Sequence, residues 1–343
     1  MSTAVQFDNV SIVFGSHPEK ALPLMDDGKD RGTVQTETGQ VLGVHNCSLD
    51  VATGEILVLM GLSGSGKSTL LRAVNGLNPV VRGAVHVNDG QNMVDITHAD
   101  KQTLRRMRLS QIAMVFQQFG LLPWRTVREN VQLGLELGGM DKAERDAKVE
   151  QQLELVGLSQ WADRKVGELS GGMQQRVGLA RAFVTDAPLL LMDEPFSALD
   201  PLIRAKLQDE LLELQQKLNR TIIFVSHDLD EAFKIGNRIA IMEGGRIVQC
   251  GTPQEIFSKP ADEYVTEFVA HMNPLGVLRA QDIMSAATGV AFGQVDAKTP
   301  VGKVMEMMTG EEGALDVMQG GQVIGQITKD DILRNLVDPR SAA

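Results

Sequence analysis

The alternation of hydrophobic and polar residues changes its period several times along the chain. Residues 5–14 alternate apolar and polar side chains, which predicts a strand of a small antiparallel sheet. Residues 43–51 are expected to form a second edge strand. Residues 16–39, between them, are polar and contain prolines and glycines at several points, so we expect an inserted loop there.

Short apolar runs bounded by turn residues follow, and they are typical of buried parallel strands. They cover residues 55–60, 111–116, 188–193 and 221–226. Strands of this kind that alternate with helices around a phosphate-binding loop indicate an α/β nucleotide-binding domain.

Two segments between these strands have the spacing of amphipathic helices. Residues 141–156 are charged and amphipathic. Residues 203–218 carry an apolar stripe, which favours a helix packed on the sheet over a face that binds a partner. The stripe consists of Ile203, Leu207, Leu211, Leu214 and Leu218.

The pattern breaks near residues 271–274, and a separate short module begins. We place the boundary at about residue 276, which divides the chain into domains 1–276 and 277–343. The module is expected to run helix–strand–strand–helix, over residues 299–308, 314–318, 322–328 and 329–336.

Composition and charge narrow the class of protein. The chain has 343 residues, 43% hydrophobic and 22% charged, which fits ordinary globular domains. Its net charge of −11 argues against nucleic acid as the main partner, because such proteins normally present a basic face. Cys47 and Cys250 have no metal-ligand spacing and are expected to be small core residues in a reducing compartment.

The chain opens with no signal peptide and contains no apolar run of about 18 residues. We therefore expect a cytoplasmic protein that reaches a membrane only by docking onto a component already there.

Residues 61–68 read GLSGSGKS and satisfy the Walker A pattern G-x-x-x-x-G-K-[ST]. They lie between the predicted strand 55–60 and a helix expected over residues 69–74. Glycines let successive backbone N–H groups turn inward, and the helix N-terminus favours an anion. Lys67 should reach the β- and γ-phosphates of ATP or GTP, and Ser68 should ligate Mg²⁺. The candidate nucleotide contacts here are Gly61, Leu62, Ser63, Gly64, Ser65, Gly66, Lys67, Ser68 and Thr69.

Residues 189–194 read LLLMDE, a Walker B strand that ends in two carboxylates. Asp193 is expected to hold Mg²⁺ largely through water, since Mg²⁺ keeps much of its hydration. Glu194, one residue further on, can polarise the water that attacks the γ-phosphate.

Residues 169–176 read LSGGMQQR and resemble the LSGGQ signature of ATP-binding cassette (ABC) proteins. Physically, they form a second glycine-permitted anion site at a helix start. In ABC proteins two cassettes dimerise head to tail, and the signature of one copy closes on the ATP held by the other. Met173 stands where the signature usually has glutamine. The start of a helix tolerates this substitution. The implied nucleotide contacts are Ser170, Gly171, Gly172 and Gln174.

Further positions match the ABC pattern. Gln117 corresponds to the Q-loop glutamine that senses Mg²⁺ and the attacking water, although Gln118 follows directly and the assignment could slip by one. Residues 197–200, SALD, correspond to the D-loop that crosses the dimer seam, and Asp200 is its nucleotide-side candidate. His227 corresponds to the switch histidine that contacts the γ-phosphate.

Phe14 occupies the position where the family places an aromatic ring against adenine, a contact that needs only a π-face. The alternative is a core phenylalanine, because the insertion separates Phe14 from the Walker A loop. Together the motifs cover residues 5 to 255. The resemblance implies an ABC-type P-loop domain with a RecA-like core, an antiparallel β subdomain and a helical subdomain.

Residues 119–127 follow the Q-loop directly, where ABC importers receive a coupling helix from their permease. Phe119 and Trp124 would be costly to leave exposed in an isolated chain, which favours a docking groove. The alternative is a buried hydrophobic corner.

Among importers, the chain resembles the ATPases that drive uptake of glycine betaine, proline betaine or choline. The insertion at residues 16–39 and the strings LMDEPFSALDPLIR (191–204) and SHDLDEA (226–232) carry this resemblance, together with the C-terminal module. That module is similar to a single CBS (cystathionine β-synthase-like) α+β module, where such ATPases often carry two. Two alternatives are open for a single module: pairing with its copy across a dimer, or a remnant.

The resemblance implies an ATP- and Mg²⁺-dependent homodimer beneath an integral membrane permease. The ATPase would lie at the cytoplasmic face of the inner membrane as a peripheral protein, and an extracytoplasmic substrate-binding protein would complete the complex. Three rival functions remain: an importer of another solute such as an amino acid, a soluble ABC ATPase, and a ligand sensor acting through the C-terminal module.

Overall fold

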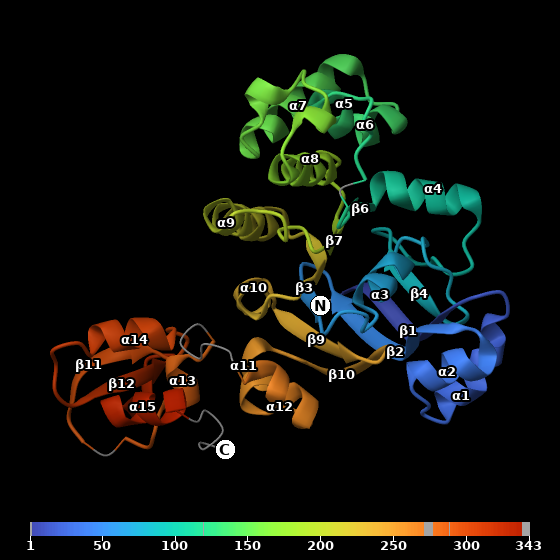
Figure 1. Ribbon diagram of the computed structural model, residues 1–343. Helices are drawn as coiled ribbons and strands as arrows, with labels where there is room; N and C mark the ends of the chain where they lie inside the picture. The colour runs from blue at the N-terminus through green and yellow to red at the C-terminus, as the bar shows by residue number, and fades with distance from the viewer. Residues whose placement is uncertain (1, 119, 271–276, 288, 338–343) are drawn as a thin grey trace. The chain divides into compact units, whose positions relative to one another are not determined.

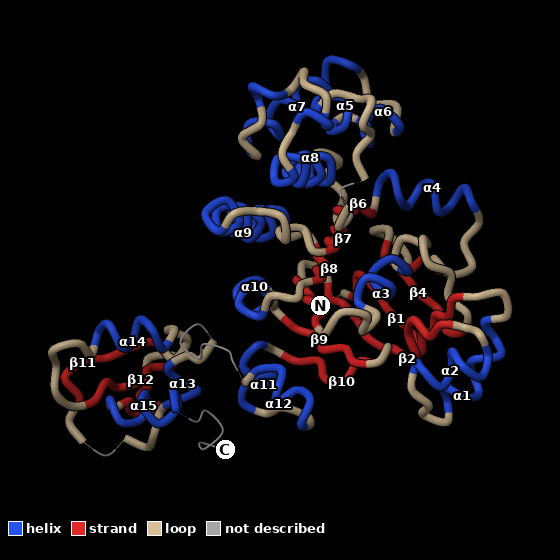
Figure 2. Tube along the Cα trace, viewed as in Figure 1, coloured by secondary structure: helices blue, strands red, loops and turns tan. Residues whose placement is uncertain are grey.

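The structure, a computed structural model, describes residues 2–118, 120–270, 277–287 and 289–337, which build three β-sheets (Figure 1, Figure 2). Contacts between Cα atoms divide the chain into two compact units. The first comprises Met1–His227 and Met242–Ile247, and the second comprises Asp228–Ile241 and Val248–Ala343. The predicted boundary at residue 276 lies outside the described residues. Within the described part of the chain, no helix combines the length and apolar character needed to cross a membrane.

An antiparallel sheet of four strands, in the order β2-β1-β4-β5, opens the first unit. β1 and β2 pair from Thr3↔Ala52 to Phe14↔Val41, which confirms the two expected strands. The bounds are β1 Thr3–Phe14, β2 Val41–Ala52, β4 Arg82–Asn88 and β5 Met93–Asp95.

Residues 16–39 form short helices rather than the expected loop, and these helices lie beside β1 and β2 in Figure 1. Ala21, Met25 and Val34 are buried in one cluster with side chains of β1 and β2, which gives the segment a small core of its own. Asp30 caps the last helix, and Gly39 ends it in the left-handed conformation (φ 69°). The helices are η1 Pro18–Ala21, α1 Leu22–Asp26 and α2 Arg31–Thr38.

A six-stranded sheet follows, in the order β10-β9-β3-β8-β7-β6. β3 pairs with β8, β8 with β7 and β7 with β6, all in parallel, as the four apolar runs predicted. The bounds are β3 Ile56–Met60, β6 Ile112–Val115, β7 Leu189–Asp193, β8 Thr221–Val225, β9 Arg238–Glu243 and β10 Arg246–Gly251.

Four helices of the first unit, α5 to α8, share a separate hydrophobic core. Val131, Val149, Leu153 and Val177 belong to it and are fully buried. The helices expected over residues 141–156 and 203–218 are confirmed as α7 and α9. The bounds are α3 Lys67–Ala73, α4 Lys101–Ser110, α5 Val127–Val131, α6 Leu133–Leu137, α7 Lys142–Leu155, η2 Ser159–Trp161, η3 Val166–Glu168, α8 Gly171–Phe183 and α9 Pro201–Leu218.

The second unit contains the expected helix–strand–strand–helix order as α14, β12, β13 and α15. Two elements were not predicted from the sequence: β11, which pairs in parallel with β12, and the short helix α13. The bounds are α10 Leu229–Ile235, α11 Pro253–Ser258, α12 Glu263–Val269, α13 Ala280–Ile283, β11 Ala291–Asp296, α14 Val301–Met307, β12 Ala314–Gln319, β13 Gln322–Ile327 and α15 Lys329–Val337.

Candidate functional site

The loop after β3 can be built only from glycines at three positions. Gly61, Gly64 and Gly66 have φ values of 140°, 80° and 105°, a region that L side chains rarely adopt. A Cβ on Gly61 would lie 2.1 Å from the carbonyl oxygen of Met242, and one on Gly66 would lie 2.7 Å from that of Gly43. The backbones of Met242 and Gly43 therefore pack directly against the loop. Helix α3 begins immediately after Gly66.

Lys67 folds over the inner side of this loop. Its Nζ donates to the carbonyl oxygens of Gly61 (2.8 Å) and Leu62 (2.9 Å) and lies 3.4 Å from Ser65 Oγ. Burial lowers the pKa of the Lys67 ammonium, while the carboxylates of Glu194 and Asp193 oppose that shift. The arrangement holds a desolvated cation where an incoming phosphate could replace the carbonyl oxygens as its partner.

The first Walker B carboxylate is fully buried, and both of its oxygens have partners. Ser68 Oγ donates to Asp193 Oδ1 (2.6 Å), and Arg72 Nη2 donates to Asp193 Oδ2 (2.8 Å). Sequence analysis did not identify Arg72, because nothing in the motif predicts a partner for Asp193 on the following helix.

Glu194, next along the chain, has a left-handed backbone (φ 49°) that costs a non-glycine residue about 1 kcal/mol or more. Its N–H donates to Val225 O (3.1 Å), which holds this conformation at the strand end. Gln117 Nε2 donates to Glu194 Oε2 (3.1 Å), and His227 Nδ1 lies 3.4 Å from the same oxygen. The structure thus brings the three candidate catalytic side chains together, and the contact favours Gln117 over Gln118.

The signature residues begin α8 as predicted. Ser170 is the N-cap, and its Oγ accepts the N–H of Met173 (3.4 Å); because the donor is backbone, the Met173 side chain does not affect the cap. Gln174 Nε2 donates back to Leu169 O (3.1 Å). Asp200 caps α9 by accepting from Ile203 N (3.1 Å).

Ser170, Gly171 and Asp200 are all exposed. Among the described residues, no hydrogen bond joins residues 170–172 to the Walker A loop of the same chain. Gly172 instead packs near the D-loop, since a Cβ there would lie 3.3 Å from Ala198 O. The structure therefore presents the signature at the surface, while residues of the Walker A loop, the Walker B strand, the Q-loop and the switch position cluster.

Gln175 links the signature helix α8 to Glu194 at the end of β7, and it was not predicted from the sequence. The residue is 1% exposed; its Nε2 donates to Glu194 O (3.3 Å), and its Oε1 accepts from Ala198 N (3.1 Å). Two adjacent glutamines in the string MQQR look alike in sequence, and only the packing of α8 distinguishes the buried one.

Phe14 is 39% exposed at the end of β1, which does not fit a core phenylalanine. A Cβ on Gly43 would lie 2.9 Å from the Phe14 ring and 3.1 Å from the methyl group of Thr69. The ring therefore lies close to the helix that follows the Walker A loop, despite the insertion between them.

Trp124 is 68% exposed, which contradicts the alternative of a buried corner. Phe119 lies outside the described residues. A separate cavity of about 500 Å³ opens in the same unit, and Arg105, Arg108 and Arg181 are among the residues that line it. Its apolar lining includes Leu77, Leu109, Phe116, Leu133 and Leu137.

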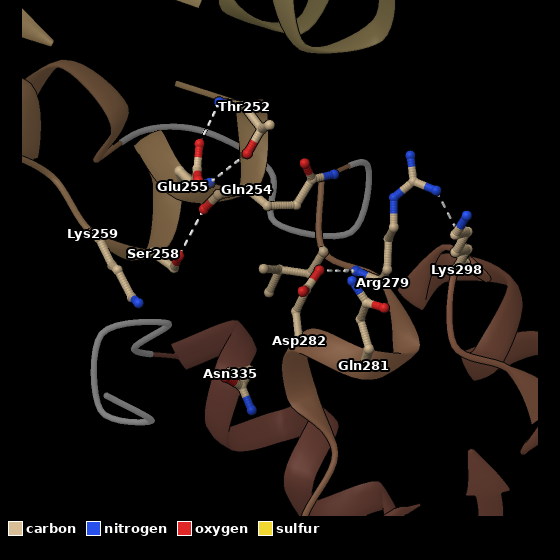
Figure 3. A pocket seen from close by; sticks show the side chains of 11 residues that line it. Thr252, Gln254, Glu255, Ser258, Lys259, Arg279, Gln281, Asp282, Lys298 and Asn335 are labelled. Carbon is tan, nitrogen blue, oxygen red and sulfur yellow. Dashed lines mark hydrogen bonds between the residues drawn. The ribbon is translucent and has the colours of Figure 1, made fainter. Parts of the chain in front are cut away.

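A cavity of about 700 Å³ in the second unit lies against α11 and α13 (Figure 3). Its two carboxylates act as helix caps: Glu255 accepts from Thr252 N (2.8 Å), and Asp282 accepts from Arg279 N (2.9 Å). The lining therefore offers helix-capping groups rather than free acids.

Comparison with known proteins is consistent across sequence and structure. Residues 44–197 match the family model described as ABC transporter. The glycine betaine transport ATP-binding protein OpuAA of Bacillus subtilis is 49% identical, over 83% of this chain and 68% of its own length. The glycine betaine/proline betaine transport system ATP-binding protein ProV of Escherichia coli is 48% identical, over 82% and 70%.

Two further matches extend this result. The trimethylamine N-oxide transport system ATP-binding protein TmoW of Ruegeria pomeroyi is 42% identical, over 97% of this chain and 96% of its own length. Among solved structures, the dimeric post-hydrolysis state of the ATP-binding cassette MJ0796 bound to ADP and Pi superposes with a TM-score of 0.63 at 30% identity, covering 72% of this chain and 98% of that one. This chain belongs to the family of ABC transporter ATP-binding proteins.

Proposed function

We propose that this chain hydrolyses ATP to drive uptake of a quaternary amine, namely glycine betaine, proline betaine or choline, through a separate permease. As an ABC transporter ATP-binding protein the chain is an ATPase. The observation that carries the catalytic assignment is the convergence of Gln117 and His227 on the carboxylate of Glu194. The solute is inferred by analogy from relatives named for glycine betaine transport.

The Walker A loop binds the triphosphate through its inward N–H groups, and Lys67 moves from the loop carbonyls to the β- and γ-phosphates. Phe14 stacks on the adenine. Glu194 accepts a proton from the attacking water, which Gln117 and His227 orient. The remaining nucleotide contacts from this copy are Gly61, Leu62, Ser63, Gly64, Ser65, Gly66, Ser68 and Thr69.

Mg²⁺ fits the side chains next to the loop, because Ser68, Asp193 and Gln117 offer oxygen ligands, which this ion prefers. Both oxygens of Asp193 already have partners, which suits a contact through water rather than direct ligation. Mg²⁺ would neutralise charge that develops on the phosphates.

The active unit is a head-to-tail homodimer in this proposal. Ser170, Gly171, Gly172, Gln174 and Asp200 contact the nucleotide held by the partner copy, which gives the exposed signature its ligand. Closure of the two copies on ATP moves the permease. The permease docks at the cavity of about 500 Å³ that residues of α4, α6 and α8 line, and at the exposed Trp124. This contact would place the chain on the cytoplasmic face of the inner membrane. A binding protein on the other side delivers the solute.

Glu194→Gln tests this mechanism. The variant should bind ATP, lose turnover and accumulate as an ATP-bound dimer on size-exclusion chromatography. Glu213→Gln, on the exposed side of α9, is the matched control and should behave as wild type. Undiminished ATPase activity of Glu194→Gln would remove the catalytic assignment.

Trimethylamine N-oxide is a second candidate solute, because TmoW matches this chain almost end to end whereas OpuAA and ProV are longer. Uptake of labelled glycine betaine, proline betaine, choline and trimethylamine N-oxide by vesicles with the whole transporter would decide between them. We further propose that residues 277–343 form one CBS-like module, supported by the β12–β13 pair and the flanking helices.

A further inference from the structure

One side chain of the insertion at residues 16–39, that of Arg31, contacts the Walker A loop. Arg31, the first residue of α2, donates from Nη1 to Gly64 O and from Nη2 to Gly43 O (2.6 Å). We propose that Arg31 is a positioning residue that holds the phosphate loop in its ATP-binding conformation, so that the insertion is part of the nucleotide site. This inference rests on the proposed use of that loop for ATP.

The physical reason lies in the direction of the loop's peptide groups. When a loop turns N–H groups toward a phosphate, some of its carbonyl groups point outward, and each of these needs a donor. Ser65 O accepts from Gly245 N (3.0 Å), and Gly64 O accepts from Arg31. Gly64 has a φ of 80°, and the bond to Arg31 holds this otherwise flexible glycine in one conformation.

The second bond of Arg31 fixes the loop against β2. Gly43 O accepts the Nη2 bond, and it is the same oxygen that a Cβ on Gly66 would approach to 2.7 Å. The Phe14 ring and the Thr69 methyl also lie close to Gly43. One guanidinium therefore ties the phosphate loop to the strand position next to the candidate adenine-stacking ring.

The charge of Arg31 adds to this effect. The side chain is half-buried, and burial lowers its pKa, yet a guanidinium stays protonated at neutral pH. A partly desolvated cation beside the loop attracts the phosphates more strongly than a fully solvated one.

The insertion is anchored by other contacts, which makes the inference testable. Arg82 donates two bonds to Asp26 (2.7 and 2.8 Å), and Arg246 Nη2 donates to Met25 O (3.0 Å). Replacement of Arg31 should therefore leave α1 and α2 in place.

The test compares Arg31→Gln and Arg31→Lys with Lys29→Gln in the full-length chain. Lys29 is exposed two residues away, so its replacement removes the same charge without touching the loop. We expect Arg31→Gln to raise the Kd and the KM for ATP about tenfold, as for loss of a charge-assisted hydrogen bond, with a smaller effect on kcat. Arg31→Lys should recover part of the loss, and Lys29→Gln should stay within about twofold of wild type.

A KM for Arg31→Gln within about twofold of wild type would overturn the inference, and so would equal effects of Arg31→Gln and Lys29→Gln. A lower Tm with unchanged Kd would also overturn it, since that result marks a purely structural brace. These outcomes are distinct from failure of the proposed function, in which the wild-type chain itself would not bind ATP.

Discussion

Replacement of Gln175 by methionine tests whether the signature helix α8 positions Glu194 and the D-loop within one copy. The methionine side chain is apolar and nearly isosteric with glutamine, so it fills the same space but cannot form the two hydrogen bonds of Gln175. The variant removes the donor to Glu194 O and the acceptor for Ala198 N. Ser197 Oγ still donates to Glu194 O (3.1 Å), so the carbonyl keeps a partner, whereas Ala198 N loses its bond to Gln175.

The size of the effect follows from these partners. An unsatisfied buried amide costs about 1–3 kcal/mol, and the low end applies because the D-loop is partly open to water. Burial of an apolar side chain in place of the amide offsets part of this cost. We expect a loss of about 1–2 kcal/mol, or about 2–8 °C in Tm for a domain of this size. Without Gln175, the position of the D-loop relative to the Glu194 backbone should no longer be fixed. We expect this change to lower kcat about tenfold.

The assay measures ATPase rate and thermal unfolding of the full chain, with Gln151→Met on the exposed face of α7 as the control. The ATP concentration at half-maximal rate should change less than kcat, because Gln175 does not touch the Walker A loop. A Tm loss with kcat within about twofold of wild type would refute the positioning role. An unchanged Tm would refute the buried hydrogen-bond geometry itself.

Three further predictions concern other parts of the chain. Hydrogen bonds from Arg82 and then His45 hold the pKa of Asp26 well below its usual 3.8. This contribution to stability is present above pH 3.8 and is lost as the pH falls further; Asp26→Asn should therefore be less stable than wild type at pH 7, with a smaller difference at pH 3 in urea melts. Burial raises the pKa of Cys47 to about 12, so iodoacetamide at pH 8 should label native Cys47 more slowly than Cys250, as read by mass spectrometry. Deletion of residues 277–343 should alter the salt or nucleotide dependence of uptake in vesicles, and an unchanged profile would mark the module as structural only.

The parallel sheet was predictable from sequence because both of its faces are covered. Strands such as β7 and β8 are buried at every position, so their sequences are continuous apolar runs. The helices of residues 16–39 were not predictable in the same way. Their few apolar residues, such as Met25 and Val34, become a core only against β1 and β2, which are distant in sequence. β11 was missed because only one of its six residues, Val295, is buried.

The residues of the candidate site also differ in whether a local sequence pattern predicts them. Lys67 and Asp193 follow from local patterns whose spacing is set by the loop or strand that carries them. Arg31, Arg72 and Gln175 act through contacts to residues far along the chain; Arg72 and Asp193 are 121 positions apart. No local spacing predicts such a pair, because it depends on how α3 packs against β7.

The two consecutive carboxylates at the end of β7 differ in environment, and this difference separates their chemistry. Asp193 is fully buried, and its oxygens accept from Ser68 and Arg72, so proton transfer to it would break two charge-assisted hydrogen bonds. Glu194 leaves the strand with a positive φ, and among the described residues its Oε2 is approached by the Gln117 amide and the His227 imidazole, either of which can exchange its partner for water. The backbone bonds from Glu194 N to Val225 O and from Gln175 to Glu194 O hold this turned conformation. We therefore propose the second carboxylate as the proton acceptor, and we expect any change that relaxes its backbone toward ordinary strand geometry to lower turnover before it lowers ATP affinity.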